Sequence, residues 1–141
     1  MTEVETNMNL VKLSVSLILS STCFFLLSAA TSQAELPNAL CEEIAEYVFT
    51  IHEIGYLKHG DMRRNNYAAA YNRLDSAIHA ARSKVPQSTC SRIRELAVQL
   101  RDDSERATTL LRLDSNETPQ FRKAMEACLR TRRDLVSLCG Y

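Results

Sequence analysis

Glycine is scarce in this chain, with only three among 141 residues. A loop that cradles phosphate needs several glycines so that the backbone can approach the ligand, and this composition therefore argues against a nucleotide-binding site. The sequence also contains neither a G-x-S-x-G nucleophile elbow nor an H-E-x-x-H zinc-protease pair. Its serine, histidine and aspartate residues show no spacing that implies a catalytic triad. We therefore expect a protein without enzymatic activity.

An excess of charge of either sign is also lacking, because 17 Lys and Arg residues stand against 17 Asp and Glu residues. Proteins that bind nucleic acid usually carry a clustered basic excess, which raises the local concentration of the polyanion. We therefore do not expect nucleic acid as a partner.

One long apolar run does occur, at Leu13–Leu27, and Lys12 precedes it. Ser32 and Ala34 occupy positions −3 and −1 of a cleavage site before Glu35, which is the pattern of a secretory signal peptide. The run is too short and too rich in serine for a stable membrane span. We expect residues 1–34 to be a signal peptide, leaving a single domain at 35–141 in the periplasm or outside the cell.

Two details of this N-terminal segment leave alternatives open. No positive charge stands among the first seven residues, which contain Glu3 and Glu5, so translation could begin at Met8 instead. A lipoprotein is the rival interpretation of the segment, but Cys23 lies inside the apolar run rather than after it.

The rest of the chain has apolar residues at helical spacing in four segments, near 37–59, 63–84, 88–113 and 119–139. Gly60 and Pro86 separate the first three, and Thr118 followed by Pro119 is typical of the start of a helix. No segment shows the alternating pattern of a strand. Four amphipathic helices with short turns predict an all-α, antiparallel up-down-up-down four-helix bundle.

Four cysteines remain after signal cleavage, an even number that predicts two disulfides in an exported protein. Cys128 and Cys139 lie on one helix about 16 Å apart, so they cannot bond to each other. Because Cys90 and Cys139 are nearly equidistant from the last turn, we favour Cys90–Cys139 with Cys41–Cys128. The pairing of Cys41 with Cys139 and Cys90 with Cys128 stays open.

No metal or cofactor site is expected. The cysteines have no C-x-x-C spacing for zinc, and no C-x-x-C-H motif for covalent haem. His52 and His59 are about 10 Å apart along their helix, too far to share one metal. Noncovalent haem would require ligands from the three histidines, Met62 and Met125 to meet in the core.

Two aromatic residues lie off the main apolar stripe of the first helix, Phe49 and Tyr56. An exposed aromatic pair is a typical anchor for a protein partner. We therefore expect a non-enzymatic protein-binding or structural module. The alternative is a small-ligand carrier, for an apolar ligand or noncovalent haem, with a cavity in the bundle core lined by Tyr47, Tyr67, Tyr71 and Met125.

One basic residue is predicted to be buried. Arg132 stands between Cys128 and Leu135 at spacings of four and three, which places it on the inward side of the last helix. A buried guanidinium needs a carboxylate partner, and we expect Glu43 or Glu46 of the first helix in that role.

Overall fold

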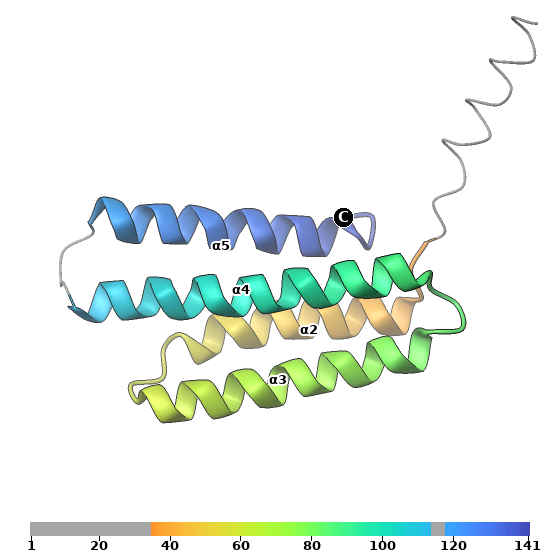
Figure 1. The fold of residues 1–141 in the computed structure, drawn as a ribbon, viewed down its shortest axis with the longest axis horizontal. Helices are drawn as coiled ribbons and strands as arrows, with labels where there is room; N and C mark the ends of the chain where they lie inside the picture. The colour runs from red at the N-terminus through yellow and green to blue at the C-terminus, as the bar shows by residue number, and fades with distance from the viewer. Residues whose placement is uncertain (1–34, 114–117) are drawn as a thin grey trace, which may run out of the picture. The chain divides into compact units, whose positions relative to one another are not determined.

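The computed structural model describes residues 35–113 and 118–141. These residues form four helices, α2 (Asn38–Ile54), α3 (Gly60–Ala81), α4 (Gln87–Leu113) and α5 (Pro119–Ser137), and no strand (Figure 1). The prediction of an all-α fold with four helices is confirmed. The predicted signal peptide lies outside the described residues. None of the described helices is long and apolar enough to cross a membrane.

The ends of the helices follow local backbone chemistry. At the start of α5, the Thr118 hydroxyl accepts a hydrogen bond from the Phe121 N–H at 3.1 Å, so the predicted cap is present. The expectation that Gly60 ends the first helix is wrong, because α2 already ends at Ile54 and Gly60 is the first residue of α3. The carbonyls of Leu57 and Lys58, in the turn between them, accept hydrogen bonds from arginines instead of continuing the helix.

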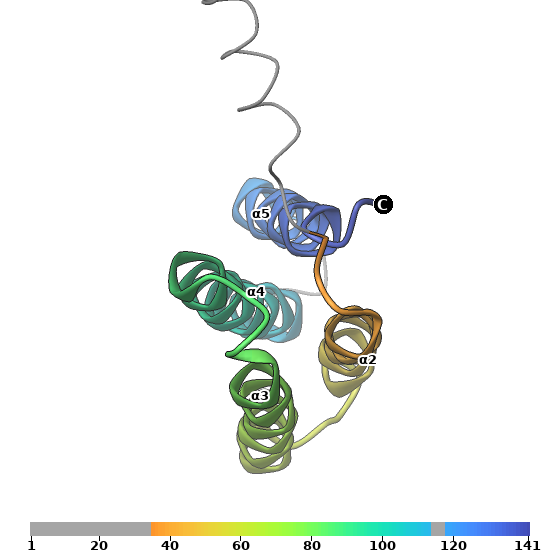
Figure 2. The same ribbon diagram turned by 90° about the vertical axis from the view of Figure 1, so that its right-hand side faces the viewer.

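The helices pack mainly in two pairs, α2 with α3 and α4 with α5. Viewed along the helices, α2 and α4 lie between α3 and α5, which share no contact among the described residues (Figure 2). The core between them is mostly aliphatic, and its largest fully buried side chains come from all four helices: Leu40, Ile44, Ile51, Leu74, Ile78, Ile93, Leu96 and Leu135. Burial of side chains of this size is the main source of stability.

Two ion pairs connect α3 and α4. Near the start of α3, Arg63 binds Glu105 in the second half of α4, at 2.8 Å. Further along α3, Asp75 binds Arg94 in the first half of α4, at 2.6 Å. The partner on α4 therefore moves backward along the chain as the residue on α3 moves forward, so these two helices run in opposite directions.

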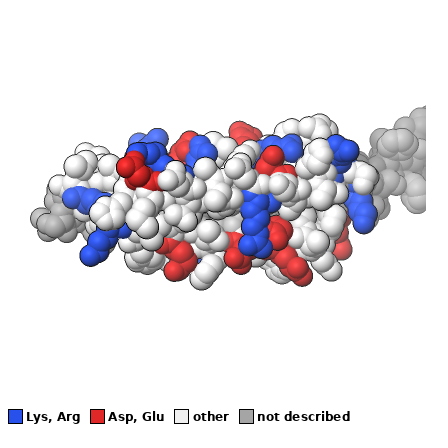
Figure 3. Space-filling model, turned by 90° about the horizontal axis from the view of Figure 1, so that it is seen from below, with Lys and Arg blue, Asp and Glu red and all other residues white. Residues whose placement is uncertain are grey.

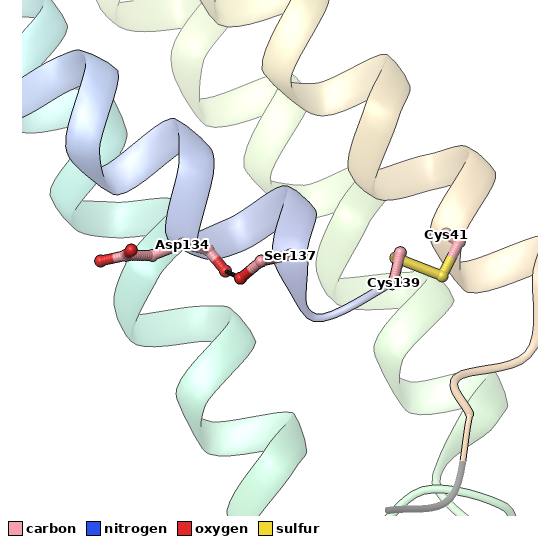
Figure 4. Close-up of a disulfide and its surroundings, with 4 residues drawn as sticks. All are labelled: Cys41, Asp134, Ser137 and Cys139. Carbon is pink, nitrogen blue, oxygen red and sulfur yellow. Dashed lines mark hydrogen bonds between the residues drawn. A yellow bond between two sulfur atoms is a disulfide. The ribbon is translucent and has the colours of Figure 1, made fainter. Parts of the chain in front are cut away.

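A disulfide joins Cys41, near the start of α2, to Cys139, just after the end of α5, with a Cα–Cα distance of 5.7 Å (Figure 4). Beside it, the Ser137 hydroxyl donates to the Asp134 carbonyl at 2.8 Å in the last turn of α5. The favoured pairing, Cys90–Cys139 with Cys41–Cys128, is therefore wrong. It required α2 to slide relative to α5, whereas the structure keeps the start of α2 level with the end of α5.

The other two cysteines are free and buried, so the prediction of a second disulfide is also wrong. The Cys128 sulfur lies 3.7 Å from the Ser104 hydroxyl of α4. Ser104 stands fourteen residues after Cys90 on that helix, a rise of about 21 Å. Cys90 and Cys128 are therefore at different levels of the bundle and too far apart to bond.

Candidate binding surface

Two neighbouring pockets open between α2 and α5, and together we call them the α2–α5 seam. The smaller is lined by Ala45, Val48, Phe49, His52, Arg132 and Val136. The larger, here called the seam pocket, has a volume of about 450 Å³ and also reaches α4. Its residues on α2 and the following turn are Val48, Ile51, His52, Gly55 and Tyr56; those on α4 are Leu100, Ser104, Ala107, Thr108, Leu111 and Arg112; those on α5 are Phe121, Met125, Cys128, Leu129 and Arg132. The two pockets share Val48, His52 and Arg132, which makes the seam continuous.

Both aromatic residues predicted as partner anchors lie on this seam. Phe49 lines the smaller pocket and is 60% exposed, and Tyr56 lines the seam pocket and is 71% exposed. His52 lies between them and packs edge-on against the Tyr56 ring, with ring centroids 5.3 Å apart. The structure thus gathers these side chains in one place, and their role as anchors remains a prediction.

Aliphatic side chains extend the exposed apolar surface from α2 onto α4 and α5. Leu111 of α4 is 45% exposed, and Leu129 of α5 is 53% exposed. Buried residues such as Ile51 and Ala107 form the floor beneath them. Clustered apolar residues that remain in contact with water are characteristic of binding surfaces, because burying them on a ligand is favourable.

The charged side chains that line the seam pocket are cationic. Arg112 donates to the carbonyls of Leu57 and Lys58 at 2.6 and 2.8 Å, which fixes its guanidinium against the turn after α2. Arg132 lines both pockets and forms no ion pair with another residue of 35–113 or 118–141. No Asp or Glu is found among the described lining residues.

Arg132 is exposed, so its predicted burial with Glu43 or Glu46 is wrong. The buried face of α5 consists of Ala124, Cys128, Thr131 and Leu135. This stripe has Thr131 at the inward position, and Arg132, one residue later, is rotated about 100° toward solvent. Glu43 instead binds Arg73 of α3 at 2.8 Å.

Among residues 35–113 and 118–141, the buried arginine is Arg63, which is 5% exposed. It forms two hydrogen bonds with Glu105, at 2.8 and 3.0 Å, and donates to the carbonyls of Leu57 and Lys58 at 3.0 and 3.3 Å. The hydrogen bond that Arg63 donates to the Glu105 carboxylate raises the pKa of Arg63 above its ordinary value. Sequence reasoning missed this residue, although its spacing of four before Tyr67 places it on the buried stripe of α3.

The tyrosines predicted to line a carrier cavity instead occupy the core. Tyr47 and Tyr67 are buried and Tyr71 is partly buried. The Tyr47 hydroxyl donates to the Ala97 carbonyl at 2.7 Å, whereas the Tyr67 hydroxyl has no partner among the described residues. Burial raises the pKa of Tyr67 to about 12. Of the four residues predicted for the cavity, only Met125 lines the seam pocket.

The seam offers little for catalysis. Cys128 is a thiol on the pocket wall, but burial raises its pKa, which keeps it protonated and a poor nucleophile. Among the described residues, no group of three or more His, Cys, Asp or Glu side chains could hold a metal ion. His52 and Met125, two residue types that ligate haem iron, do line the same pocket.

Charges elsewhere on the surface are mixed. Figure 3 shows basic and acidic groups interspersed over one face of the molecule, in keeping with the balanced composition. Comparison with protein-family models, curated proteins and solved structures found no match for this chain.

Proposed function

We propose that this chain is an exported, non-enzymatic binding protein that recognises a protein partner through the α2–α5 seam. One observation carries the proposal: Phe49 and Tyr56 stand exposed on a single continuous apolar seam that three helices form. Aromatic side chains at the centre of an interface contribute large apolar areas at low entropic cost and are frequent hot spots.

The proposal also includes the export of the chain and the removal of its signal peptide. Residues 1–34 act as a signal peptide and are removed on export, which delivers residues 35–141 to the periplasm or the extracellular space as an up-down-up-down bundle. An oxidising compartment suits the Cys41–Cys139 bond, because disulfides form and persist there.

A capture experiment tests the partner proposal. The exported protein, immobilised and exposed to an extract of its source, should retain a stoichiometric partner, and the Phe49→Ser/Tyr56→Ser variant should lose it. Tyr141→Ser is the matched control, because Tyr141 is 86% exposed and lies outside both pockets. Retention of the same proteins by all three forms would refute the seam as the binding surface.

A second candidate function, a small-ligand carrier, is favoured by the volume of the seam pocket. Small-molecule sites are apolar concavities of about 300–1,000 Å³ with a few polar groups, and the seam pocket of about 450 Å³ has this composition. Native mass spectrometry of protein purified from its source separates the two functions: added small mass supports the carrier, and a co-purified protein supports the partner proposal.

A further inference from the structure

The α5 wall of the seam pocket is mostly apolar and ends at an arginine. On α5, its lining residues run from Phe121 through Met125 and Leu129 to Arg132. The spacings of four, four and three keep these side chains on one side of the helix, over about 16 Å. The α5 wall of the pocket is therefore an apolar track with a guanidinium at its end.

The two arginines at the pocket have different roles. Arg112 holds the carbonyls of Leu57 and Lys58, so its guanidinium is engaged in shaping the turn. The Arg132 side chain forms no ion pair with any residue in the described ranges, and its guanidinium, a planar set of N–H donors, lines both pockets of the seam. Such a fork binds a carboxylate through two parallel hydrogen bonds.

The charged residues that line this pocket are all of one sign. The chain as a whole has as many acidic as basic residues, yet no Asp or Glu occurs among the described residues that line the seam pocket. An anion is therefore the complementary ligand. The volume of about 450 Å³ is near the lower end of the range for small-molecule sites, which suits one aliphatic chain better than the two chains of a phospholipid.

We propose that the seam pocket binds a free single-chain amphiphile, with its anionic head, such as a carboxylate, on Arg132 and its aliphatic chain along Leu129, Met125 and Phe121. This inference rests on the carrier function and specifies its ligand class. Burial of the chain supplies most of the affinity, and the guanidinium selects the charge of the head group.

Isothermal titration calorimetry with delipidated exported protein tests the proposal, with dodecanoate below its micellar concentration as the probe. Dodecanoate should bind at least about tenfold more tightly than dodecylamine or dodecan-1-ol, because a charge-assisted hydrogen bond is lost with either of them. Arg132→Gln should weaken dodecanoate binding about tenfold, and the adjacent exposed Arg133→Gln, outside both pockets, should leave it unchanged.

A second pair of variants tests the location of the chain. Thr108→Phe fills the seam pocket from α4 and should weaken dodecanoate binding more than about tenfold, whereas Thr109→Phe points to solvent and should have no effect. Circular dichroism confirms that each variant is folded before titration.

Several results would overturn the proposal. Absence of dodecanoate binding, or equal loss in Arg132→Gln and Arg133→Gln, would exclude the site. Equal affinity for dodecan-1-ol would retain the carrier function and refute anion selection. The protein could also be tested for co-sedimentation with phosphatidylglycerol vesicles. If it sediments with them and added dodecanoate does not release it, the source of the anion is a membrane and not a free chain.

Discussion

The contact between α3 and α4 and the contact between α2 and α5 are held in different ways. Along α3 and α4, two ion pairs, Arg63–Glu105 and Asp75–Arg94, are distributed over the length of the contact. Between α2 and α5, one disulfide joins the helices at one end of the contact among the described residues. The two pockets of the seam open further along the same contact. A covalent bond keeps two helices adjacent without side chains filling the space between them, so the remainder of the seam stays available to a ligand.

The largest effect should come from breaking the disulfide. The Cys41→Ser/Cys139→Ser variant should lose about 3–4 kcal/mol of unfolding free energy, because the bond closes a loop of 98 residues and restricts the unfolded chain. Chemical denaturation with and without reductant measures this loss. Reductant should lower the stability of the unsubstituted protein to that of the variant and leave the variant unchanged; a reductant-insensitive protein would contradict the assigned bond.

The second largest loss of stability should come from breaking the Arg63–Glu105 ion pair between α3 and α4. Arg63→Ala should cost about 2–3 kcal/mol, since it leaves Glu105 without its partner and removes two bonds to backbone carbonyls. Arg73→Ala is the matched control. Arg73 forms an equivalent pair with Glu43 but is 62% exposed, so its removal should have little effect on the denaturation midpoint. Equal losses in the two variants would contradict the buried character of the α3–α4 pair.

Two buried tyrosines allow a smaller and sharper comparison. Tyr47→Phe should lose about 1 kcal/mol with its hydrogen bond to Ala97, whereas Tyr67→Phe removes a hydroxyl that has no partner in the described structure and should be neutral or stabilising. Thermal melts of both variants at neutral pH measure the difference. A larger loss for Tyr67→Phe would show that its hydroxyl is bonded.

The buried Tyr67 also predicts that the stability of the protein depends on pH in the alkaline range. Burial raises the pKa of Tyr67 from 10.0 to about 12. Between these values the unfolded chain releases the proton while the folded chain retains it, so stability should be complete below pH 10 and fall as the pH approaches 12. Denaturation midpoints across this range should fall less steeply in Tyr67→Phe. A slope equal to that of the unsubstituted protein would rule out this contribution.

The smallest change in stability is expected at the open seam itself. Arg132→Met should alter the unfolding free energy by no more than about 0.5 kcal/mol, because the side chain is exposed and has no partner among the described residues. A large loss of unfolding free energy, measured by chemical denaturation, would instead support the prediction from the sequence that Arg132 is buried.

The sequence predicted the helices well because their number and most of their ends depend on local signals. Thr118 and Pro119 mark the start of α5 as expected. Phe49 could be selected because it lies off the apolar stripe of α2, and it is exposed as that pattern implies. Tyr56 was selected on the same pattern, but it lies in the turn after α2, so its exposure has a different origin.

The errors came from features that depend on how the helices are placed against each other. Counting residues through the turns placed Cys41 close to the level of Cys139, where the disulfide is found. The error was to assign Cys139 to Cys90 and to assume that α2 could slide along α5 until Cys41 reached Cys128. Arg132 and Thr131 differ by one position, and only the packed structure shows which of the two faces inward. The seam pocket could not be predicted, because its volume depends on the separation of α2 from α5 beyond the disulfide.

The most direct test of the central claim is whether the seam is an accessible apolar site. The fluorescence of the neutral dye N-phenyl-1-naphthylamine increases when it enters an apolar pocket, and the chain contains no tryptophan to interfere. Leu129→Glu places a carboxylate in the seam pocket, whereas Leu113→Glu changes a leucine that is 80% exposed and lies outside both pockets. We predict that the unsubstituted protein and Leu113→Glu increase the fluorescence equally, and that Leu129→Glu does not. An undiminished signal with Leu129→Glu would contradict the account.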